Sequence, residues 1–166
     1  MIKATVDAVN NGFNEAVFKG NPEFTDAHLF DGILQTDDLL FGNYLKEKGI
    51  EKKYLKSLND TIVAKLPKVS GGNNQPVPSG SVSKIFAIAQ KEAQGTGDAF
   101  VAIEHVLYGL CEAGYYIKDL LKNAGIDKRS LKEFYTRERD GDTIQSQDGD
   151  QQFKILEQFT VDLTKK

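Results

Sequence analysis

The sequence predicts an all-α fold made of two tandem four-helix repeats. Apolar residues recur at helical spacing along nearly the whole chain, alternating strand patterns are almost absent, and the second half repeats features of the first half. A chain of 166 residues can bury a core as one domain. Because each repeat alone would leave an apolar face uncovered, we expect the two to pack on each other about a pseudo-two-fold axis.

The first half predicts four helices separated by helix-breaking residues. Thr25 is placed to cap the second helix, Gly49 to end the third, and Pro67 prevents the fourth from continuing. The predicted helices cover about residues 2–17, 26–34, 37–48 and 51–66.

The second half repeats this series after a connector. Residues 67–80 are rich in Gly, Pro, Ser and Asn, so we expect little regular structure there. Ser81 is expected to cap the next helix, and Gly95-Thr96-Gly97 to end it. The predicted helices of this half cover about residues 82–94, 103–112, 115–124 and 127–139.

The internal repeat is visible residue by residue. At an offset of 77 residues, His28 matches His105 and Gly32 matches Gly109. After a slip of one residue, Gly49-Ile50 matches Gly125-Ile126. Self-similarity of this kind fixes the architecture more firmly than any single motif.

We expect residues 1–139 to form one domain, with repeat one over about 1–66 and repeat two over about 81–139. Residues 140–150 are polar and contain Gly, which is typical of a linker. Residues 151–166 carry an apolar stripe that needs a surface to pack on. They are expected either to begin the segment that leads into a following module or to dock on the same domain.

Several classes of protein are disfavoured by composition. The formal charge is −3 and no Lys/Arg block outweighs its acidic neighbours, which argues against nucleic-acid binding. The single cysteine, Cys111, excludes internal disulfides. No stretch is typical of a membrane span or a signal peptide, so we expect a cytoplasmic protein with no membrane contact. The phosphate-binding motif GxxxxGK[ST] does not occur, so we expect no ATPase activity in this chain.

His28, His105 and Cys111 are the residues that invite a catalytic or metal-binding interpretation. A closed zinc site needs three or four ligands, and neither histidine has a His at i+4 or a nearby Cys. We therefore expect both histidines to be packing or helix-start residues, and no metal. Cys111 lies on the apolar side of its helix, which favours a buried structural thiol.

Three segments resemble the N-terminal domains of ClpB-type disaggregases, members of the Clp AAA+ family. They are Leu66-Pro67-Lys68-Val69-Ser70-Gly71-Gly72, Gly97-Asp98-Ala99-Phe100-Val101-Ala102-Ile103-Glu104-His105 and Phe159-Thr160-Val161-Asp162-Leu163-Thr164. The resemblance covers the whole chain in order.

The resemblance implies a function for the domain. It implies a non-catalytic module, linked to AAA+ modules of the same chain, that binds unfolded or aggregated polypeptides through an apolar groove with an acidic rim. The rim positions are Asp98 and Glu104; their other interpretation is ordinary surface charge. ATP and magnesium would bind the AAA+ modules, so no cofactor is expected here. The isolated domain is expected to be a monomer, and the full-length protein a hexamer.

We expect the first helix of each repeat to line the groove. Ile85, Phe86 and Ile88 cover more than one helical face, so at least one is expected to be exposed. Tyr115 and Tyr116 are adjacent and cannot both point inward, which makes Tyr115 a further candidate contact.

Three alternatives stay open at this stage. The first is the N-domain of a protease-associated Clp unfoldase, which docks adaptor proteins. The second is a small metal-dependent helical hydrolase that uses His28 and His105. The third is a purely structural cap on the hexamer.

Overall fold

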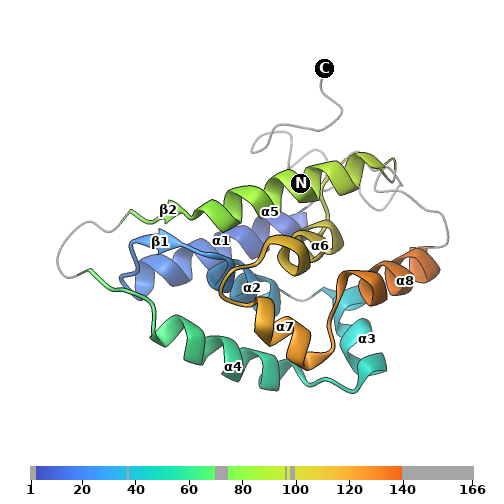
Figure 1. The fold of residues 1–166 in the computed structure, drawn as a ribbon, viewed down its shortest axis with the longest axis horizontal. Coiled ribbons are helices and arrows are strands. Elements are labelled where there is room, and N and C mark those ends of the chain that lie inside the picture. Colours follow the sequence, from blue (N-terminus) through green and yellow to red (C-terminus); the bar gives the residue numbers. More distant parts are fainter. Residues whose placement is uncertain (1–2, 37, 70–74, 96, 98–99, 140–166) are drawn as a thin grey trace.

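The computed structural model describes residues 3–36, 38–69, 75–95, 97 and 100–139. Within these residues the fold has eight helices and one two-stranded sheet (Figure 1). The elements are α1 (Lys3–Phe18), β1 (Glu23–Phe24), α2 (Asp26–Gln35), α3 (Leu39–Lys48), α4 (Lys52–Ala64), β2 (Val77–Pro78), α5 (Gly80–Gly95), α6 (Ile103–Ala113), α7 (Lys118–Ala124) and α8 (Lys128–Arg139).

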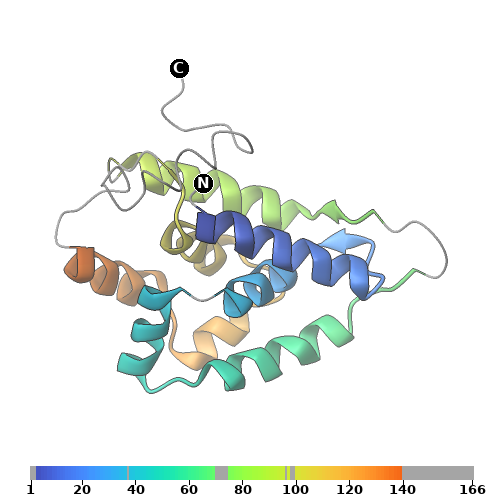
Figure 2. The ribbon, with the colours of Figure 1, turned by 180° about the vertical axis from the view of Figure 1, so that it is seen from behind.

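The predicted all-α fold of two four-helix repeats is confirmed. Helices α1–α4 form one repeat and α5–α8 the other, with α2 packed on α1 and α6 packed on α5. Both views place α5 along one edge of the molecule with α1 beside it, α2 and α6 near the centre, and α4 along the opposite edge (Figures 1 and 2). The predicted linker 140–150 and the segment 151–166 lie outside the described residues, so the domain division stays a prediction there.

The core is formed chiefly by α2 and α6, which are buried over most of their length. Glycine allows each to approach its partner helix closely. A Cβ atom on Gly32 would lie 1.9 Å from the Ala8 carbonyl oxygen of α1. On Gly109 it would lie 2.6 Å from the Ile85 carbonyl oxygen of α5. The repeat-equivalent glycines therefore mark the same helix crossing in both halves.

Several of the predicted helix ends are confirmed. Thr25 is the N-cap of α2, and Gly49 ends α3 in the left-handed conformation at φ 71°. Its repeat equivalent Gly125 ends α7 in the same way at φ 85°. A left-handed residue at this place is what favours glycine over other residues.

The described part of the connector contains one short strand, β2, which pairs in parallel with β1, with Glu23 opposite Val77 and Phe24 opposite Pro78. Two strand residues agree with the expectation of little regular structure, whereas the expected cap of the following helix was wrong. The helix α5 begins at Gly80, and the hydroxyl that accepts from the Val82 N–H at 3.3 Å belongs to Ser79. Ser81, the expected cap, instead donates to the Asp26 carboxylate at 3.0 Å.

The helix α7 begins three residues later than the expected 115. The backbone N–H groups of Tyr115, Tyr116 and Ile117 all donate to Oδ2 of Asp26, at 3.0, 2.8 and 3.0 Å. Another contact between the repeats is the hydrogen bond from Thr5 Oγ1 of α1 to the Val101 carbonyl oxygen, at 3.1 Å. These bonds hold repeat one and repeat two together through buried polar groups.

None of the described helices combines the length and apolar character needed to cross a bilayer.

Candidate functional site: a groove between α1 and α5

An apolar groove of about 610 Å³ lies between the first helices of the two repeats. It is lined by Val9, Asn10, Phe13, Phe24, Pro78, Val82, Ser83, Phe86, Ala87 and Gln90. No charged residue occurs in this lining, as far as the structure describes it. The first helices of both repeats do border this groove, while its role in binding stays a prediction.

Helical spacing determines which residues form the walls of the groove. Val9 and Phe13 are four residues apart on α1, and Val82 and Phe86 are four residues apart on α5, so each pair shares one helix face. Val9 and Phe86 are also equivalent positions of the two repeats, at the same offset of 77 residues. The groove therefore lies where the two repeats present equivalent faces to each other.

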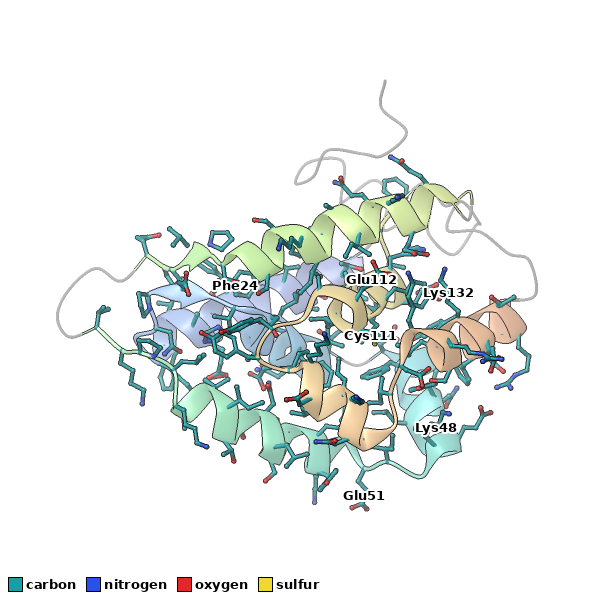
Figure 3. All side chains as sticks on the ribbon, in the orientation of Figure 1. Phe24, Lys48, Glu51, Cys111, Glu112 and Lys132 are labelled. Atoms are coloured by element: carbon teal, nitrogen blue, oxygen red, sulfur yellow. The ribbon has the colours of Figure 1, made fainter. Side chains whose placement is uncertain are left out.

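The floor of the groove depends on the short sheet. Phe24 of β1 is buried, and its ring contacts the Phe13 ring edge to face at a centroid distance of 5.8 Å. Figure 3 shows Phe24 beneath the N-terminal half of α5. Phe13 and Phe86 are half-buried and keep part of their rings accessible. Because the floor is closed and the walls are partly open, the groove offers apolar surface to a ligand.

The structure separates the predicted contact residues of α5. Phe86 lines the groove. Ile85 is 0% exposed and belongs to the core, so it offers no surface to a ligand. Ile88 is half-buried and is not among the residues that line the groove. The burial of Ile85 follows from its contact with Gly109, where α5 and α6 cross closely.

The other predicted residues lie away from the groove lining. Tyr115 is 74% exposed, and its ring meets the Tyr116 ring edge to face at a centroid distance of 4.9 Å. Glu104 is only 3% exposed, in the first turn of α6, so its side chain is not at the surface. Asp98 lies outside the described residues. The roles of these residues in binding stay predictions, and the burial of Glu104 does not favour a rim role for it.

The acidic rim stays a prediction, because Asp98 lies outside the described residues. Among the described lining residues, the exposed polar side chains are Asn10, Ser83 and Gln90. Neutral amides and a hydroxyl can donate or accept hydrogen bonds without preference for either charge.

Sequence reasoning missed several residues of the groove. Val9 and Phe13 were part of the apolar pattern of α1, and their spacing could have identified them. Phe24 and Pro78 gave no such indication, because they meet only through the pairing of β1 and β2. A two-residue strand is too short to show an alternating pattern.

Both histidines have structural partners at a helix start. The N–H of Thr25 donates to Nδ1 of His28 at 2.9 Å, and the N–H of Ala102 donates to Nδ1 of His105 at 2.8 Å. Since Nδ1 of His28 accepts, its Nε2 donates to Oδ1 of Asn21, at 2.8 Å. Burial lowers the pKa of His28 from 6.5 to about 4, so the ring is neutral near pH 7. The expected helix-start role is confirmed for both.

The described residues show neither a cluster of metal ligands nor an activated cysteine nucleophile. They contain no cluster of three or more His, Cys, Asp or Glu side chains that could hold a metal ion. Burial raises the pKa of the Cys111 thiol to about 12, so it stays protonated near neutral pH. A thiol in that state is a poor nucleophile, although Cys111 is half-buried and not fully buried as expected.

Comparison with known proteins found a matching family model and several similar sequences. The model of the Clp repeat (R) N-terminal domain matches residues 3–124. The chain is 32% identical over 162 residues to the chaperone protein ClpB of Corynebacterium glutamicum, covering 97% of this chain and 19% of the relative. It is 30% identical over 152 residues to the ClpB of Agrobacterium fabrum, covering 91% of this chain and 17% of the relative. The chain thus spans about a fifth of the length of these relatives.

Solved structures show the same fold. The N-terminal domain of Hsp104 from Candida albicans matches with a TM-score of 0.75 and 22% identity, over 87% of this chain and 94% of that one. The N-terminal domain of the ClpV1 ATPase from the Escherichia coli EAEC Sci1 type VI secretion system matches with a TM-score of 0.64 and 15% identity, over 78% and 80% of the two chains.

Proposed function

Because the chain belongs to the family of Clp repeat N-terminal domains, we propose that it binds unfolded or aggregated polypeptides transiently in the groove between α1 and α5. In this proposal it is the non-catalytic N-terminal domain of an ATP-dependent disaggregase and passes the bound segment to an AAA+ ring. The observation that carries the proposal is the uncharged groove with two half-buried phenylalanines, Phe13 and Phe86, on its walls.

The groove suits weak and general binding. A Leu or Phe side chain of a client that becomes fully buried contributes about 1.5–3 kcal/mol. Two such side chains, less the cost of ordering the client, correspond to dissociation constants of about 0.1 mM or weaker. Weak binding supports a delivery role, because a segment held tightly here would not be released to a translocating ring.

The alternative function is docking of an adaptor protein in the same groove. A folded adaptor would bind through one defined surface segment, whereas the disaggregase role requires binding of many unrelated unfolded chains. Competition between a permanently unfolded polypeptide and a candidate adaptor separates the two functions.

The proposal can be tested by a substitution that places a charge on the groove wall. Ala87 is exposed on α5 and lines the groove, so Ala87→Arg introduces a guanidinium that must lose water when an apolar segment binds. Gln94→Arg is the matched control, because it adds the same side chain to an exposed position of α5 outside the groove lining.

Fluorescence anisotropy with a labelled, permanently unfolded, apolar-rich polypeptide reports the affinity. We expect Ala87→Arg to weaken binding about tenfold and Gln94→Arg to leave it within about twofold of the unsubstituted chain. Equal affinities for all three chains would exclude the groove as the binding site.

A further inference from the structure

A second groove, of about 710 Å³, runs along α4 and includes Leu34 of α2 in its lining. It is lined by Leu34, Lys52, Lys53, Lys56, Ser57, Asp60, Thr61 and Ala64. The helices α4 and α5 lie along opposite edges of the molecule (Figure 1), and the two grooves share no lining residue. The two surfaces can therefore be occupied at the same time.

The second groove is basic, although the chain as a whole is acidic at −3. Lys56 pairs with Asp31 at 2.9 Å and with Asp60 at 3.0 Å, so its charge is compensated. Within the part of the chain that the structure describes, Lys52 donates to the Thr36 carbonyl oxygen, at 3.3 Å, and Lys53 is exposed. No ion pair of Lys52 or Lys53 occurs among the described residues. Two lysine charges are therefore available at one end of the groove.

The position of these lysines is unfavourable for the helix that carries them. Lys52 and Lys53 are the first two residues of α4, where the helix dipole is already positive, and the first turn has no acidic residue. The N-cap residue Glu51 makes no side-chain hydrogen bond to the helix, and Figure 3 shows it pointing away from the domain. By contrast, α2 and α6 begin with Asp26 and Glu104 in their first turns.

The rest of the groove provides apolar contact. Ala64 of α4 is exposed and contributes aliphatic surface, lysine side chains add the methylene groups of their stems, and Leu34 of α2, only 4% exposed, closes the floor. A ligand that fits must therefore combine carboxylates at the Lys52 and Lys53 end with an aliphatic side chain further along α4. An acidic polypeptide segment has this chemistry, whereas a nucleic acid lacks the aliphatic group.

We propose that the α4 groove binds an acidic segment of a partner polypeptide, with its carboxylates on Lys52 and Lys53 and an aliphatic side chain against Ala64 and the lysine stems. This site is independent of the proposed client groove. It gives the domain a means of selecting a charged partner while the groove between α1 and α5 holds an apolar segment.

The test is an NMR titration of the isotope-labelled chain with a short synthetic peptide rich in Glu and containing Leu. The matched peptide has Gln in place of every Glu. We expect the acidic peptide to shift the amide signals of Lys52, Lys53, Ser57 and Thr61, and not those of Phe13 and Phe86. We expect the Gln peptide to bind at least about tenfold more weakly.

Variants of the protein test whether the acidic peptide binds at Lys52 and Lys53. Lys52→Gln with Lys53→Gln is expected to weaken binding of the acidic peptide about tenfold, and Lys84→Gln with Lys91→Gln, two exposed lysines of α5, to change it less than twofold. Absence of shifts at millimolar peptide, equal binding of the Gln peptide, or insensitivity to the first pair would each overturn the proposal. A dimer in light scattering that Lys52→Gln with Lys53→Gln dissociates would assign the surface to a second copy instead, and would overturn it also.

Discussion

The carboxylate of Asp26, in the first helical repeat, accepts a hydrogen bond of 2.8 Å from the backbone N–H of Tyr116, in the second repeat. The same oxygen accepts from the N–H groups of Tyr115 and Ile117, and the other oxygen accepts from Ser81. Asp26 is 0% exposed. At the offset of 77, the equivalent residue of repeat two is Ile103, so this contact exists once and breaks the internal symmetry.

Removal of the Asp26 carboxylate should therefore destabilise the whole domain. Asp26→Ala leaves three backbone N–H groups without their acceptor, and we expect the free energy of unfolding to fall by about 3–5 kcal/mol. Urea denaturation measures the change. Asp7→Ala, which removes only a surface ion pair with Lys3, is the control and should cost about 0.5 kcal/mol. Equal costs for the two variants would contradict the structural role of Asp26.

The close crossing of α1 and α2 predicts the effect of a single methyl group. Gly32→Ala would place a Cβ atom 1.9 Å from the Ala8 carbonyl oxygen, so the helices must separate. We expect a loss of at least about 3 kcal/mol, seen as a lower midpoint of thermal unfolding. Gly42→Ala in α3 is the matched control, because nothing lies within 4 Å of its Cβ position. It should stabilise the domain by about 0.5–1 kcal/mol.

The depressed pKa of His28 predicts a dependence of stability on pH. Burial disfavours the charged ring and lowers the pKa to about 4 in the folded state, from the ordinary value of 6.5. The unfolded chain therefore binds the proton more readily, so the stabilising contribution is complete above pH 6.5 and is lost as the pH falls toward 4.

Urea denaturation at a series of pH values between 7 and 4.5 tests this expectation. His28→Gln removes the titrating group, so its stability should fall less steeply over that interval. Parallel curves for the two proteins would show that the His28 ring does not contribute.

Two neighbouring residues of α5 should respond differently to truncation. Ile85 is wholly buried, and Ile85→Ala should lower the free energy of unfolding by about 2–5 kcal/mol. Phe86 lines the groove and is half-buried, so Phe86→Ala should weaken client binding about fivefold with a smaller loss of stability. Denaturation and anisotropy on both variants separate the effects. An undiminished affinity in Phe86→Ala would contradict its role in the groove.

The helices were predictable because their causes are local. Helical spacing of apolar residues, a capping Thr25 and a left-handed Gly49 act within a few positions of the chain. The strand pair was not predictable, since Glu23 and Val77 meet only in the folded molecule. The late start of α7 has the same origin, because Asp26 is distant in sequence from Tyr115.

The groove was predictable in part. The first helices of the repeats could be assigned to it, because equivalent faces of a duplicated unit meet near the symmetry axis. Which residue of α5 points outward could not be read from the sequence, since Ile85, Phe86 and Ile88 are all apolar. The burial of Glu104 was also hidden, because a carboxylate in the first turn of a helix is ordinarily exposed.

The most direct test of the central claim is an NMR titration of the isotope-labelled chain with a permanently unfolded, apolar-rich polypeptide. The account predicts shifts in fast exchange that cluster on Val9, Phe13, Phe86 and Ala87, the walls of the groove between α1 and α5. The account would be contradicted if high concentrations of the polypeptide shifted none of these signals, or only the signals of residues elsewhere.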